Sequence, residues 1–324
     1  MDFPAWNGER RQDDRGTRKK TTMHLLWGID LGGTKIEGVV LENTPALNVL
    51  ARLRIPTEAE NGYRHIVQQV ARVVGLLRAE VGRHPEKLGV GGPGALDPDT
   101  QTMKNCNTTA LNGQPLHRDL EEALGVPVVL ANDANCFAVA ETRLGAVREQ
   151  APGARTVFGV IMGTGVGGGI VIGGKLLEGR HGIAGEWGHN FLDASGGPCY
   201  CGRGGCVETV ISGTALELYY ARLAGRHRPL PEIVARHEQA ADPAATATVE
   251  RLLYFFGKGM AGVINILDPD VAVLGGGLGN IDLLYTEGVE AVKPFVFNNS
   301  LHTKFLKPKL GDSAGVFGAA LLAG

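Results

Sequence analysis

The chain has 324 residues and a formal net charge of −2 at pH 7, from 32 Lys and Arg against 34 Asp and Glu. A domain takes roughly 100–200 residues, so this length suits two lobes around a cleft. The balanced charge excludes a broad basic face for a nucleic-acid partner. The 48 glycines stand in short runs, which favours ligand-binding loops over a fibrous or disordered chain.

The first 22 residues are charged and lack apolar periodicity, so we expect a disordered N-terminal extension at 1–22 and a folded part from Met23. They hold no continuous apolar core of the kind that a secretory signal needs. Residues 156–174 are uncharged but rich in glycine, which costs about 1 kcal/mol per residue in a helix relative to alanine. We therefore predict a cytoplasmic protein with no membrane partner.

The first half of the chain has the pattern of an α/β unit. Apolar residues from Ile66 to Leu77 recur at helical spacing. Two apolar runs, LGVGG and VPVVLAND, read as buried strands that end in polar loops, where α/β sheets place ligands. The expected strands are 24–30, 35–42, 49–55, 88–92 and 126–133, and the expected helices are 63–81 and 136–144.

The second half opens with a copy of the first hairpin. GIDLGGTKIEGVVL, from Gly28, aligns without gaps with GVIMGTGVGGGIVI, from Gly159, which predicts an internal duplication. We expect helices at 214–223 and 249–267, a buried strand at 268–277, and a closing helix at 314–322 that returns to the first lobe. The predicted division is a small α/β lobe at 23–136 plus 312–324 and a large α/β lobe with a zinc-binding loop at 137–311.

The turn of the first hairpin has the composition of a phosphate site. Gly32 and Gly33 let backbone N–H groups approach phosphate oxygens without a Cβ in the way. Thr34 adds a hydroxyl, and Lys35 adds a cation. Asp30, at the end of the strand, could hold a hydrated Mg²⁺ against the phosphates. An ordinary glycine hairpin is the alternative.

The second glycine turn matches G-x-G-x-x-G, but it runs into a strand instead of opening a helix, which argues against a Rossmann site. No P-loop sequence occurs. Two facing glycine hairpins, with an acid on the first only, suit the polyphosphate of ATP with one metal ion. The candidates in this turn are Gly163, Thr164, Gly165, Gly167 and Gly168. Gly276 and Gly277 follow the later strand and could border adenine or ribose, or could serve only packing.

Asn132 and Asp133 stand between a strand and a helix. Both are good N-cap residues, so helix capping is the alternative for each. Opposite a phosphate cleft, a general-base role for Asp133 becomes the better interpretation. Phosphoryl transfer needs mainly positioning and charge neutralisation, together with a base for the proton of the attacking hydroxyl.

One imidazole and three thiols are the ligand set of a closed tetrahedral zinc site, and this chain has them within one short loop. The four candidates are His189, Cys199, Cys201 and Cys206. A disulfide is the weaker alternative, and free thiols favour a reducing compartment. Cys106 and Cys136 should pack as small apolar groups. Glu186 and Glu208 flank the loop, and with His189, Asn105 and Asn107 they offer the donors and acceptors that a polyol requires, although amide-rich loops also form turns.

These motifs resemble the ROK family of sugar kinases and repressors over about residues 23–323. The resemblance lies in GIDLGGTK, LANDAN, GTGVGGG, GEWGH and CYCGRGGCVET, and is strongest to bacterial fructokinases of the manno(fructo)kinase type. It implies an actin-like ATPase (ribonuclease H-like) α/β fold with two lobes around a central cleft. It also implies that Asp133 deprotonates the 6-hydroxyl of the sugar. The sugar-binding residues it implies are Asn107, Asn132, Asp133, Glu186, His189 and Glu208.

The resemblance implies an ATP- and Mg²⁺-dependent hexose 6-kinase with a structural Zn²⁺, D-fructose as the first substrate and a homodimer as the default assembly. A kinase for glucose, mannose or an N-acetylated hexosamine is the alternative, and a non-catalytic sugar sensor a more remote one. His189 would place one ring nitrogen on zinc and the other toward the sugar. Two departures, Gly92 and Ala110, stand where such fructokinases have bulky residues, and both enlarge the sugar pocket. Only 22 residues precede Met23, so the DNA-binding domain of ROK repressors is not expected.

Overall fold

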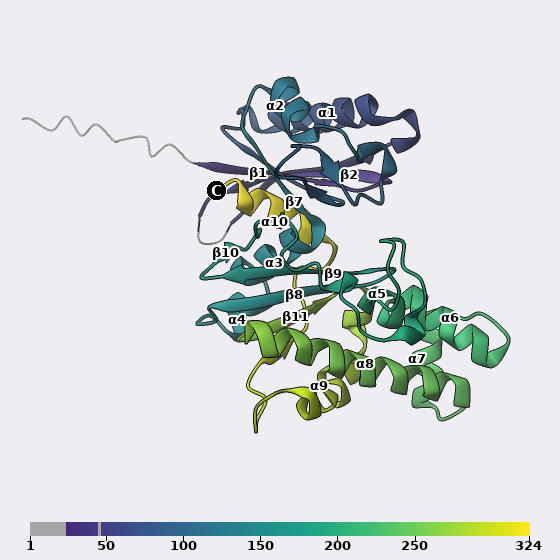
Figure 1. Ribbon diagram of the computed structural model, residues 1–324. Coiled ribbons are helices and arrows are strands. Elements are labelled where there is room, and N and C mark those ends of the chain that lie inside the picture. Colours follow the sequence, from purple (N-terminus) through teal and green to yellow (C-terminus); the bar gives the residue numbers. More distant parts are fainter. Residues whose placement is uncertain (1–23, 45–46) are drawn as a thin grey trace, which may run out of the picture.

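The computed structural model describes residues 24–44 and 47–324, and it consists of two α/β units stacked one above the other (Figure 1). The extension predicted at 1–22, together with Met23, lies outside the described residues. Each unit is built on a five-stranded mixed sheet. The α/β class expected from the sequence is confirmed.

The first sheet has the order β3-β2-β1-β4-β7. Its strands are β1 (Leu25–Leu31), β2 (Lys35–Glu42), β3 (Val49–Pro56), β4 (Leu88–Gly92) and β7 (Val128–Asn132). β1, β2 and β3 pair antiparallel, whereas β4 and β7 run parallel to β1. The carboxyl ends of β1, β4 and β7 therefore meet at one edge of the sheet, which is where α/β proteins place ligands.

The second sheet repeats this topology in the order β10-β9-β8-β11-β12. Its strands are β8 (Thr156–Met162), β9 (Val166–Ile172), β10 (Lys175–Leu176), β11 (Val271–Gly275) and β12 (Lys304–Leu306). The hairpin β8–β9 corresponds to β1–β2, as the duplication predicts. The register differs by one residue from the ungapped alignment, because Leu31 pairs with Ile36 but Met162 pairs with Val166. The second turn is therefore one residue tighter than the first.

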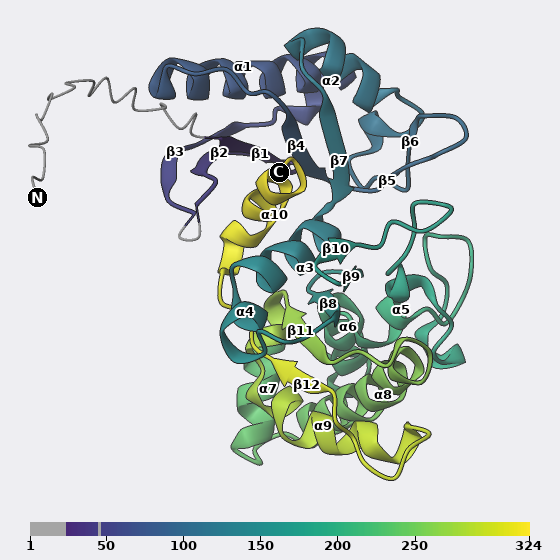
Figure 2. The same cartoon turned by 90° about the vertical axis from the view of Figure 1, so that its left-hand side faces the viewer.

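Two helices lie between the sheets, α3 (Asp133–Arg143) and α10 (Ala314–Leu322) (Figures 1 and 2). They pack on each other, with α10 against β1 and β4 and α3 against β8 and β9. Glycine permits this close approach: a Cβ on Gly89 would overlap the carbonyl of Ala319, and one on Gly318 would overlap that of Cys136. The closing helix thus returns to the first unit, as the sequence predicts.

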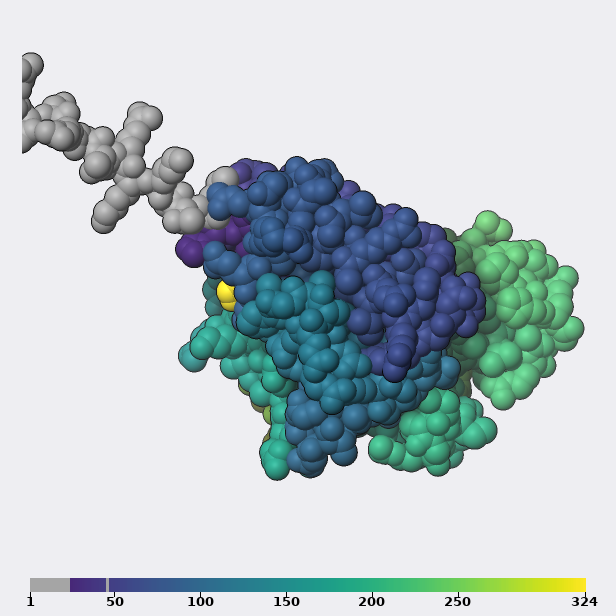
Figure 3. Space-filling model, turned by 90° about the horizontal axis from the view of Figure 1, so that it is seen from above, coloured from purple at the N-terminus to yellow at the C-terminus, as the bar shows by residue number. Residues whose placement is uncertain are grey.

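Helices also cover the outer faces of both sheets. On the first sheet these are α1 (Tyr63–Val81) and α2 (Leu116–Leu124); the second half contributes α5 (Val207–Ile211), α6 (Gly213–Ala224), α7 (Leu230–Glu238), α8 (Pro243–Leu267) and α9 (Glu287–Val292). The short helix α4 (Ala146–Gln150) instead packs beside α3. Helix α1 has the predicted bounds. Helix α8 begins six residues before the predicted start at 249, because Asp242 caps it and Pro243 occupies its first turn. Seen from above in Figure 3, green residues of the second half project beyond the first unit.

The buried apolar side chains form three clusters. One lies within the first unit around Trp27 and Ile66, and one within the second around Phe158 and Phe256. The third draws on both units around α3 and α10. The predicted boundary between residues 136 and 137 falls inside α3, and the division into lobes stays a prediction. Across the part of the chain that the structure describes, no helix combines the length and apolarity needed to cross a bilayer.

Candidate active site

Two acidic residues meet at the edge where the parallel strands of the first sheet end. Asp30 lies near the end of β1, and Asp133 is the first residue of α3, directly after β7. Burial, and then the negative charge of Asp133, raises the pKa of Asp30 to about 6. The structure therefore brings together the predicted magnesium ligand and the predicted base.

The capping alternative is satisfied by Asn132 and not by its neighbour. The Asn132 side chain accepts a hydrogen bond from the backbone N–H of Asn135 at 2.7 Å. The Asp133 carboxylate accepts from the adjacent Ala134 N–H at 2.9 Å, and desolvation by the surrounding protein raises the pKa of Asp133 above its ordinary value. The helix start thus places a solvent-exposed carboxyl group at the site and does not depend on that group as its N-cap.

The first glycine turn exposes the groups expected of a phosphate site. The Gly32 N–H is already engaged with the carbonyl of Lys35, and the Gly32 carbonyl accepts from the Thr57 hydroxyl. Within residues 24–44 and 47–324, the N–H groups of Gly33 and Thr34 have no hydrogen-bond partner, and both residues are exposed. The turn therefore fits an anion through Gly33, Thr34 and the Lys35 side chain, with Gly32 holding the turn itself.

The second glycine turn is tied into the second unit. The Gly163 carbonyl accepts from the N–H of Gly213 at the start of α6, at 2.7 Å. A Cβ on Gly163 would meet nothing within 4 Å, whereas a Cβ on Gly165 would overlap a carboxylate oxygen of Glu208. That oxygen accepts from the Val166 N–H at 2.9 Å. The bare backbone at Gly165 therefore makes room for Glu208.

Three other glycines predicted to contact nucleotide have a packing reason for lacking a side chain. A Cβ on Gly168 would lie 2.7 Å from the Gly185 carbonyl, and one on Gly167 would lie 3.3 Å from Ala134. Gly276 has φ +74 and abuts Met162, whereas a Cβ on Gly277 would meet nothing within 4 Å. A nucleotide role for these residues and for Thr164 stays a prediction, and of this group Gly277 has the open surroundings it needs.

Polar groups predicted to bind sugar gather beside Asp133. Asn132 donates a hydrogen bond from Nδ2 to Oε1 of Glu186 at 3.1 Å. Burial raises the pKa of Glu186. Glu208 is fixed by its bond to Val166, so one of its oxygens is committed to the protein. Asn132, Glu186 and Glu208 thus form a preorganised acceptor-rich wall.

Asn107 is not joined to that wall by a hydrogen bond. Its side chain is exposed, and among the described residues no hydrogen bond links it to Glu186, His189 or Glu208. Its neighbour Thr108 lies beside the first turn, where a Cβ on Gly33 would be 3.2 Å from the Thr108 hydroxyl. Ala110 packs against the apolar core of the first unit and lines neither the cavity between β9 and α8 nor the cavity along β7. The sugar role of Asn107 stays a prediction.

The loop after residue 189 assembles a tetrad that fits zinc. The ligand atoms of His189, Cys199, Cys201 and Cys206 all lie within 4.8 Å of one another. Cys199 Sγ is 3.6 Å from Nδ1 of His189, and Cys201 Sγ is 3.6 Å from Cys206 Sγ. Thiolates bound tetrahedrally at about 2.3 Å from zinc would lie about 3.8 Å apart, whereas a disulfide needs about 2.05 Å. The donor set fits zinc, and the disulfide alternative is wrong.

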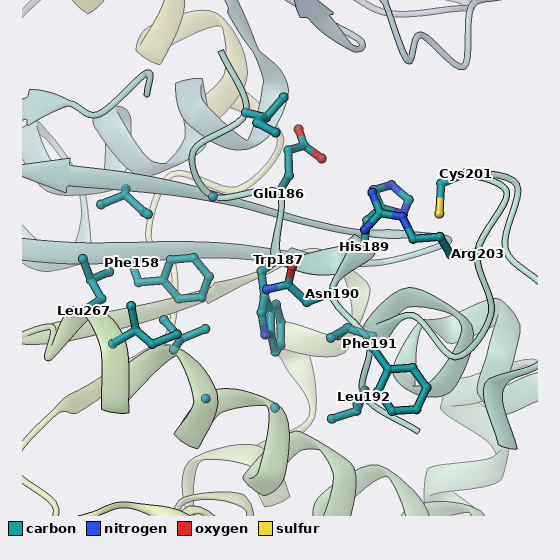
Figure 4. Close-up of a pocket in the computed structure, with 18 of the residues that line it drawn as sticks. Phe158, Glu186, Trp187, His189, Asn190, Phe191, Leu192, Cys201, Arg203 and Leu267 are labelled. Atoms are coloured by element: carbon teal, nitrogen blue, oxygen red, sulfur yellow. The ribbon is translucent and has the colours of Figure 1, made fainter. Parts of the chain in front are cut away.

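A cavity of roughly 910 Å³ opens beside the polar wall, between β8, β9, the segment after Gly185 and helix α8. Figure 4 shows Phe158, Trp187 and Leu267 on its apolar side, with Glu186 pointing away from them. His189 lies beside Cys201 and Arg203 at the opposite end (Figure 4). The metal loop therefore forms one end of the space that adjoins the polar wall.

Two residues of this region were not anticipated from the sequence. The Tyr200 hydroxyl is 2.9 Å from Nε2 of His189, the nitrogen expected to face the sugar. The Tyr200 side chain is 75% exposed, but partial desolvation, and then the charge of Glu208, raises its pKa to about 12. Asn135 is 7% exposed, and its Oδ1 is buried with no hydrogen-bond partner in the described structure. In the sequence, Tyr200 lies between two predicted zinc ligands, and Asn135 has the position of a helix-capping residue. The sequence therefore offers no separate reason to predict a role in the site for Tyr200 or Asn135.

Comparison with known proteins places these features in context. A family model described as "ROK family" matches residues 26–324. An N-acetyl-D-glucosamine kinase of Vibrio parahaemolyticus is 37% identical, covering 92% of this chain and 99% of the relative. A ROK hexokinase from Thermus thermophilus is 35% identical with a TM-score of 0.81, covering 92% and 97% of the two chains. A ROK glucokinase from Streptomyces griseus, in complex with glucose and AMPPNP, is 30% identical with a TM-score of 0.71, covering 92% and 99%.

Proposed function

The chain belongs to the ROK family, and on that premise we propose that it transfers the γ-phosphoryl group of ATP to the 6-hydroxyl of N-acetyl-D-glucosamine. Family membership and the matches to solved ROK kinases confirm the predicted actin-like ATPase fold. They also carry the coarser conclusion that the protein is a sugar kinase. The acceptor hydroxyl and the choice of sugar are the finer part of the proposal.

The preferred sugar changes from the first expectation. The sequence favours D-fructose, whereas the relatives described above are an N-acetyl-D-glucosamine kinase, a hexokinase and a glucokinase. These names support the alternative of a kinase for glucose, mannose or an N-acetylated hexosamine, and they give the fructokinase type no support. We take N-acetyl-D-glucosamine because it is the named substrate of the relative at 37% identity.

The observation that carries the mechanism is the position of Asp133, an exposed carboxyl group at the start of α3 close to Asp30 and Glu186. As the sugar oxygen forms its bond to the γ-phosphorus, the bond from that phosphorus to the bridging oxygen of ADP breaks, and Asp133 accepts the proton of the 6-hydroxyl. Desolvation by the surrounding protein raises the pKa of Asp133, which makes its carboxylate a stronger base. Because the ionised form is the base, turnover should fall as the pH drops through that pKa.

The groups around Asp30 support a binding site for the magnesium salt of ATP. When bound, Mg²⁺ neutralises charge on the phosphates. Asp30 offers an oxygen ligand. Burial and the charge of Asp133 disfavour the ionised form of this carboxyl group, so a cation bound beside it would stabilise that form. The exposed N–H groups of Gly33 and Thr34 and the cation of Lys35 would hold phosphate oxygens. The second turn, at Gly163 and Gly165, faces the same reaction from the other unit.

The zinc tetrad supports a positioning role for the metal. Zinc bound by His189, Cys199, Cys201 and Cys206 would stabilise the loop outright. Gly202 and Gly205 have φ of +85 and +71, which glycine adopts readily, so the loop can wrap one ion. Helix α5 begins at Val207 directly after Cys206, and Glu208 is in its first turn. Zinc would thereby fix both His189 and Glu208. A homodimer and a cytoplasmic location remain part of the proposal.

The experiment that tests this function is the exchange Asp133→Asn, which keeps size but removes the base. Loss of a general base lowers turnover by about 10²–10⁴-fold. We expect ADP release from ATP and N-acetyl-D-glucosamine to fall by that factor, while binding of the sugar, followed by its effect on Tm, persists. Asp282→Asn, an exposed carboxylate far along the chain, is the matched control. Full turnover in Asp133→Asn would remove this residue from the mechanism, and no ADP release from the unaltered protein with any hexose would favour the sugar sensor.

A further inference from the structure

A second cavity, of about 350 Å³, is lined by Asn132 and does not include the four residues of the zinc loop tetrad. It follows the free edge of β7 and is closed by the short hairpin β5–β6 (Ala95–Leu96 and Met103–Lys104) and by residues 176–182. These two walls belong to different units, and they touch where Lys104 Nζ donates to the His181 carbonyl at 3.3 Å. The cavity is therefore a built space that both units line, and it opens beside the catalytic helix start.

The walls carry more apolar than polar side chains. The apolar lining includes Leu31, Val90, Leu96, Met103, Leu130 and Leu176, and the polar lining includes Gln101, His117 and Glu178 besides Asn132 and Asn135. The apolar part favours a small hydrocarbon substituent through burial. In the proposed function the sugar hydroxyls bind at Glu186 and Glu208.

One polar group in the lining lacks a partner. Asn135 lines the cavity, is 7% exposed, and keeps its Oδ1 buried with no hydrogen-bond partner among the described residues. Its backbone N–H is already bound by Asn132, so the side chain is not needed for capping. A buried amide oxygen without a partner is costly. This oxygen lies against β9, 2.9 Å from where a Cβ on Gly169 would stand, so a ligand in the cavity reaches it once the amide turns. Because amide oxygen and nitrogen are assigned by their surroundings, Asn135 can serve a ligand amide in either orientation.

Gly92 keeps the cavity open. It is the last residue of β4 and lines the space, and a Cβ there would make only ordinary contacts with Leu31 at 3.6 Å. Its φ is not in the left-handed region, so the backbone does not require glycine at this point. The missing side chain therefore serves the volume of the cavity and not the conformation of the strand.

We propose that this cavity binds the N-acyl group of a 2-acylamino hexose, with Asn135 hydrogen-bonded to the acyl amide and Gly92 making room for the acyl chain. A secondary amide carries both a polar N–H or carbonyl for Asn135 and a methyl or longer chain for the apolar wall. The volume exceeds that of an acetyl group, so N-propanoyl and N-butanoyl glucosamine should also be accepted. This inference rests on the proposed kinase function and names its substrate class.

The test compares kcat/KM for N-acetyl-, N-butanoyl-glucosamine and glucose in the full-length protein, with ADP release as the assay. Gly92→Val should lower the ratio of N-butanoyl-glucosamine to glucose by roughly tenfold or more, with a smaller fall for Gly92→Ala, because methyl-sized changes in a pocket have effects of this size. Asn135→Leu should lower the N-acyl to glucose ratio through KM. Gly75→Ala adds the same methyl on α1, where it meets nothing within 4 Å, and should leave the ratio unchanged.

A second readout keeps the inference separate from the kinase function. The rise in Tm on adding N-acetyl-D-glucosamine, compared with glucose, reports binding without turnover. Selective loss of the N-acyl response in Gly92→Val and Asn135→Leu supports the cavity. Equal loss for both sugars, or a wild-type protein that binds glucose as well as its N-acyl derivatives, overturns it. Absence of ADP release with an intact N-acyl binding preference would instead overturn only the proposed function.

Discussion

The two glycine hairpins share one topology but differ in the acidic groups at their turns. The turn after β1 carries an acid, Asp30, whose pKa is raised by burial and by the charge of Asp133. The aligned position before the turn of β8–β9 is Ile161, and this second turn instead accommodates the carboxylate of Glu208 through Gly165. Duplication thus supplies a scaffold twice, and the reaction depends on the positions where the two copies differ.

Of the predictions that test this difference between the hairpins, removal of the acid from the first hairpin should have the largest effect on turnover. Asp30→Asn keeps the turn but removes the predicted magnesium ligand, and metal-assisted charge stabilisation contributes several kcal/mol. We expect turnover to fall at least about a hundredfold, with KM for ATP raised. The control Asp268→Asn alters an acid of the second half outside both hairpins. Turnover within about twofold of the unaltered protein would show that the hairpins do not differ in function.

The same variant should be more stable than the unaltered protein near neutral pH. The pKa of Asp30 is raised from 3.8 to about 6 in the fold, so the native state binds the proton more tightly, and stability falls as the pH rises from 4 to 6. Ionisation of Asp30 lowers the free energy of unfolding by about 3 kcal/mol above pH 6 and has no effect on it below pH 4. Denaturation of Asp30→Asn at pH 4 and pH 7.5 measures it. An equal difference at both values would contradict the assignment.

Among the described residues, a metal-binding tetrad is found in the second half and not in the first, so removal of zinc should affect the two units differently. Treatment with a chelator, or Cys206→Ser, should loosen the loop around Cys199 and Cys206 and the start of α5 while β1 and β2 keep their protection. Hydrogen exchange measured by mass spectrometry distinguishes the two units. We expect KM for sugar to rise at least about tenfold, because loss of groups that orient a metal site costs 10–100-fold. Metal analysis that finds no stoichiometric zinc would contradict the tetrad.

Within the second hairpin, two glycines give a matched pair. A methyl at Gly165 would overlap the Glu208 carboxylate, whereas one at Gly163 meets nothing within 4 Å. Gly165→Ala should displace Glu208 from the Val166 N–H and lower kcat/KM for sugar about tenfold, since losing a hydrogen bond to a charged group costs about 1.5–3 kcal/mol. Gly163→Ala should keep the sugar KM. Equal effects would mean that both glycines act through the turn itself.

Much of this scaffold is predictable from local patterns. Helix α1 follows from apolar spacing between Ile66 and Leu77 and ends at Gly82 in the left-handed region. The start of α8 is missed because its first turn, PAATAT, has no apolar stripe, and only the Asp242 cap marks it. The zinc tetrad is predictable because its four ligands are close in sequence.

The remaining features depend on contacts between distant segments. Gly92 signals a larger pocket in the sequence, but the cavity also needs Asn135 and the walls at 95–104 and 176–182. The packing role of Gly168 depends on Gly185, and the one-residue register difference between hairpins arises from the turns. The local sequence does not indicate contacts between distant segments. The sequence therefore could not distinguish a phosphate-binding role for Gly168 from its close packing against Gly185.

The smallest expected effect concerns Tyr200, which has no counterpart in the first half. With Nδ1 of His189 turned toward the thiols, Nε2 can donate to the Tyr200 oxygen at 2.9 Å, which leaves the phenolic O–H free to donate to a sugar hydroxyl. Tyr200→Phe should therefore raise KM for sugar about two- to tenfold, the equivalent of one neutral hydrogen bond, with kcat unchanged. Tyr254→Phe, on the exposed side of α8, is the control. The sequence predicts instead that Nε2 of His189 itself faces the sugar. In that case Tyr200 competes with the sugar for Nε2, and Tyr200→Phe should lower KM.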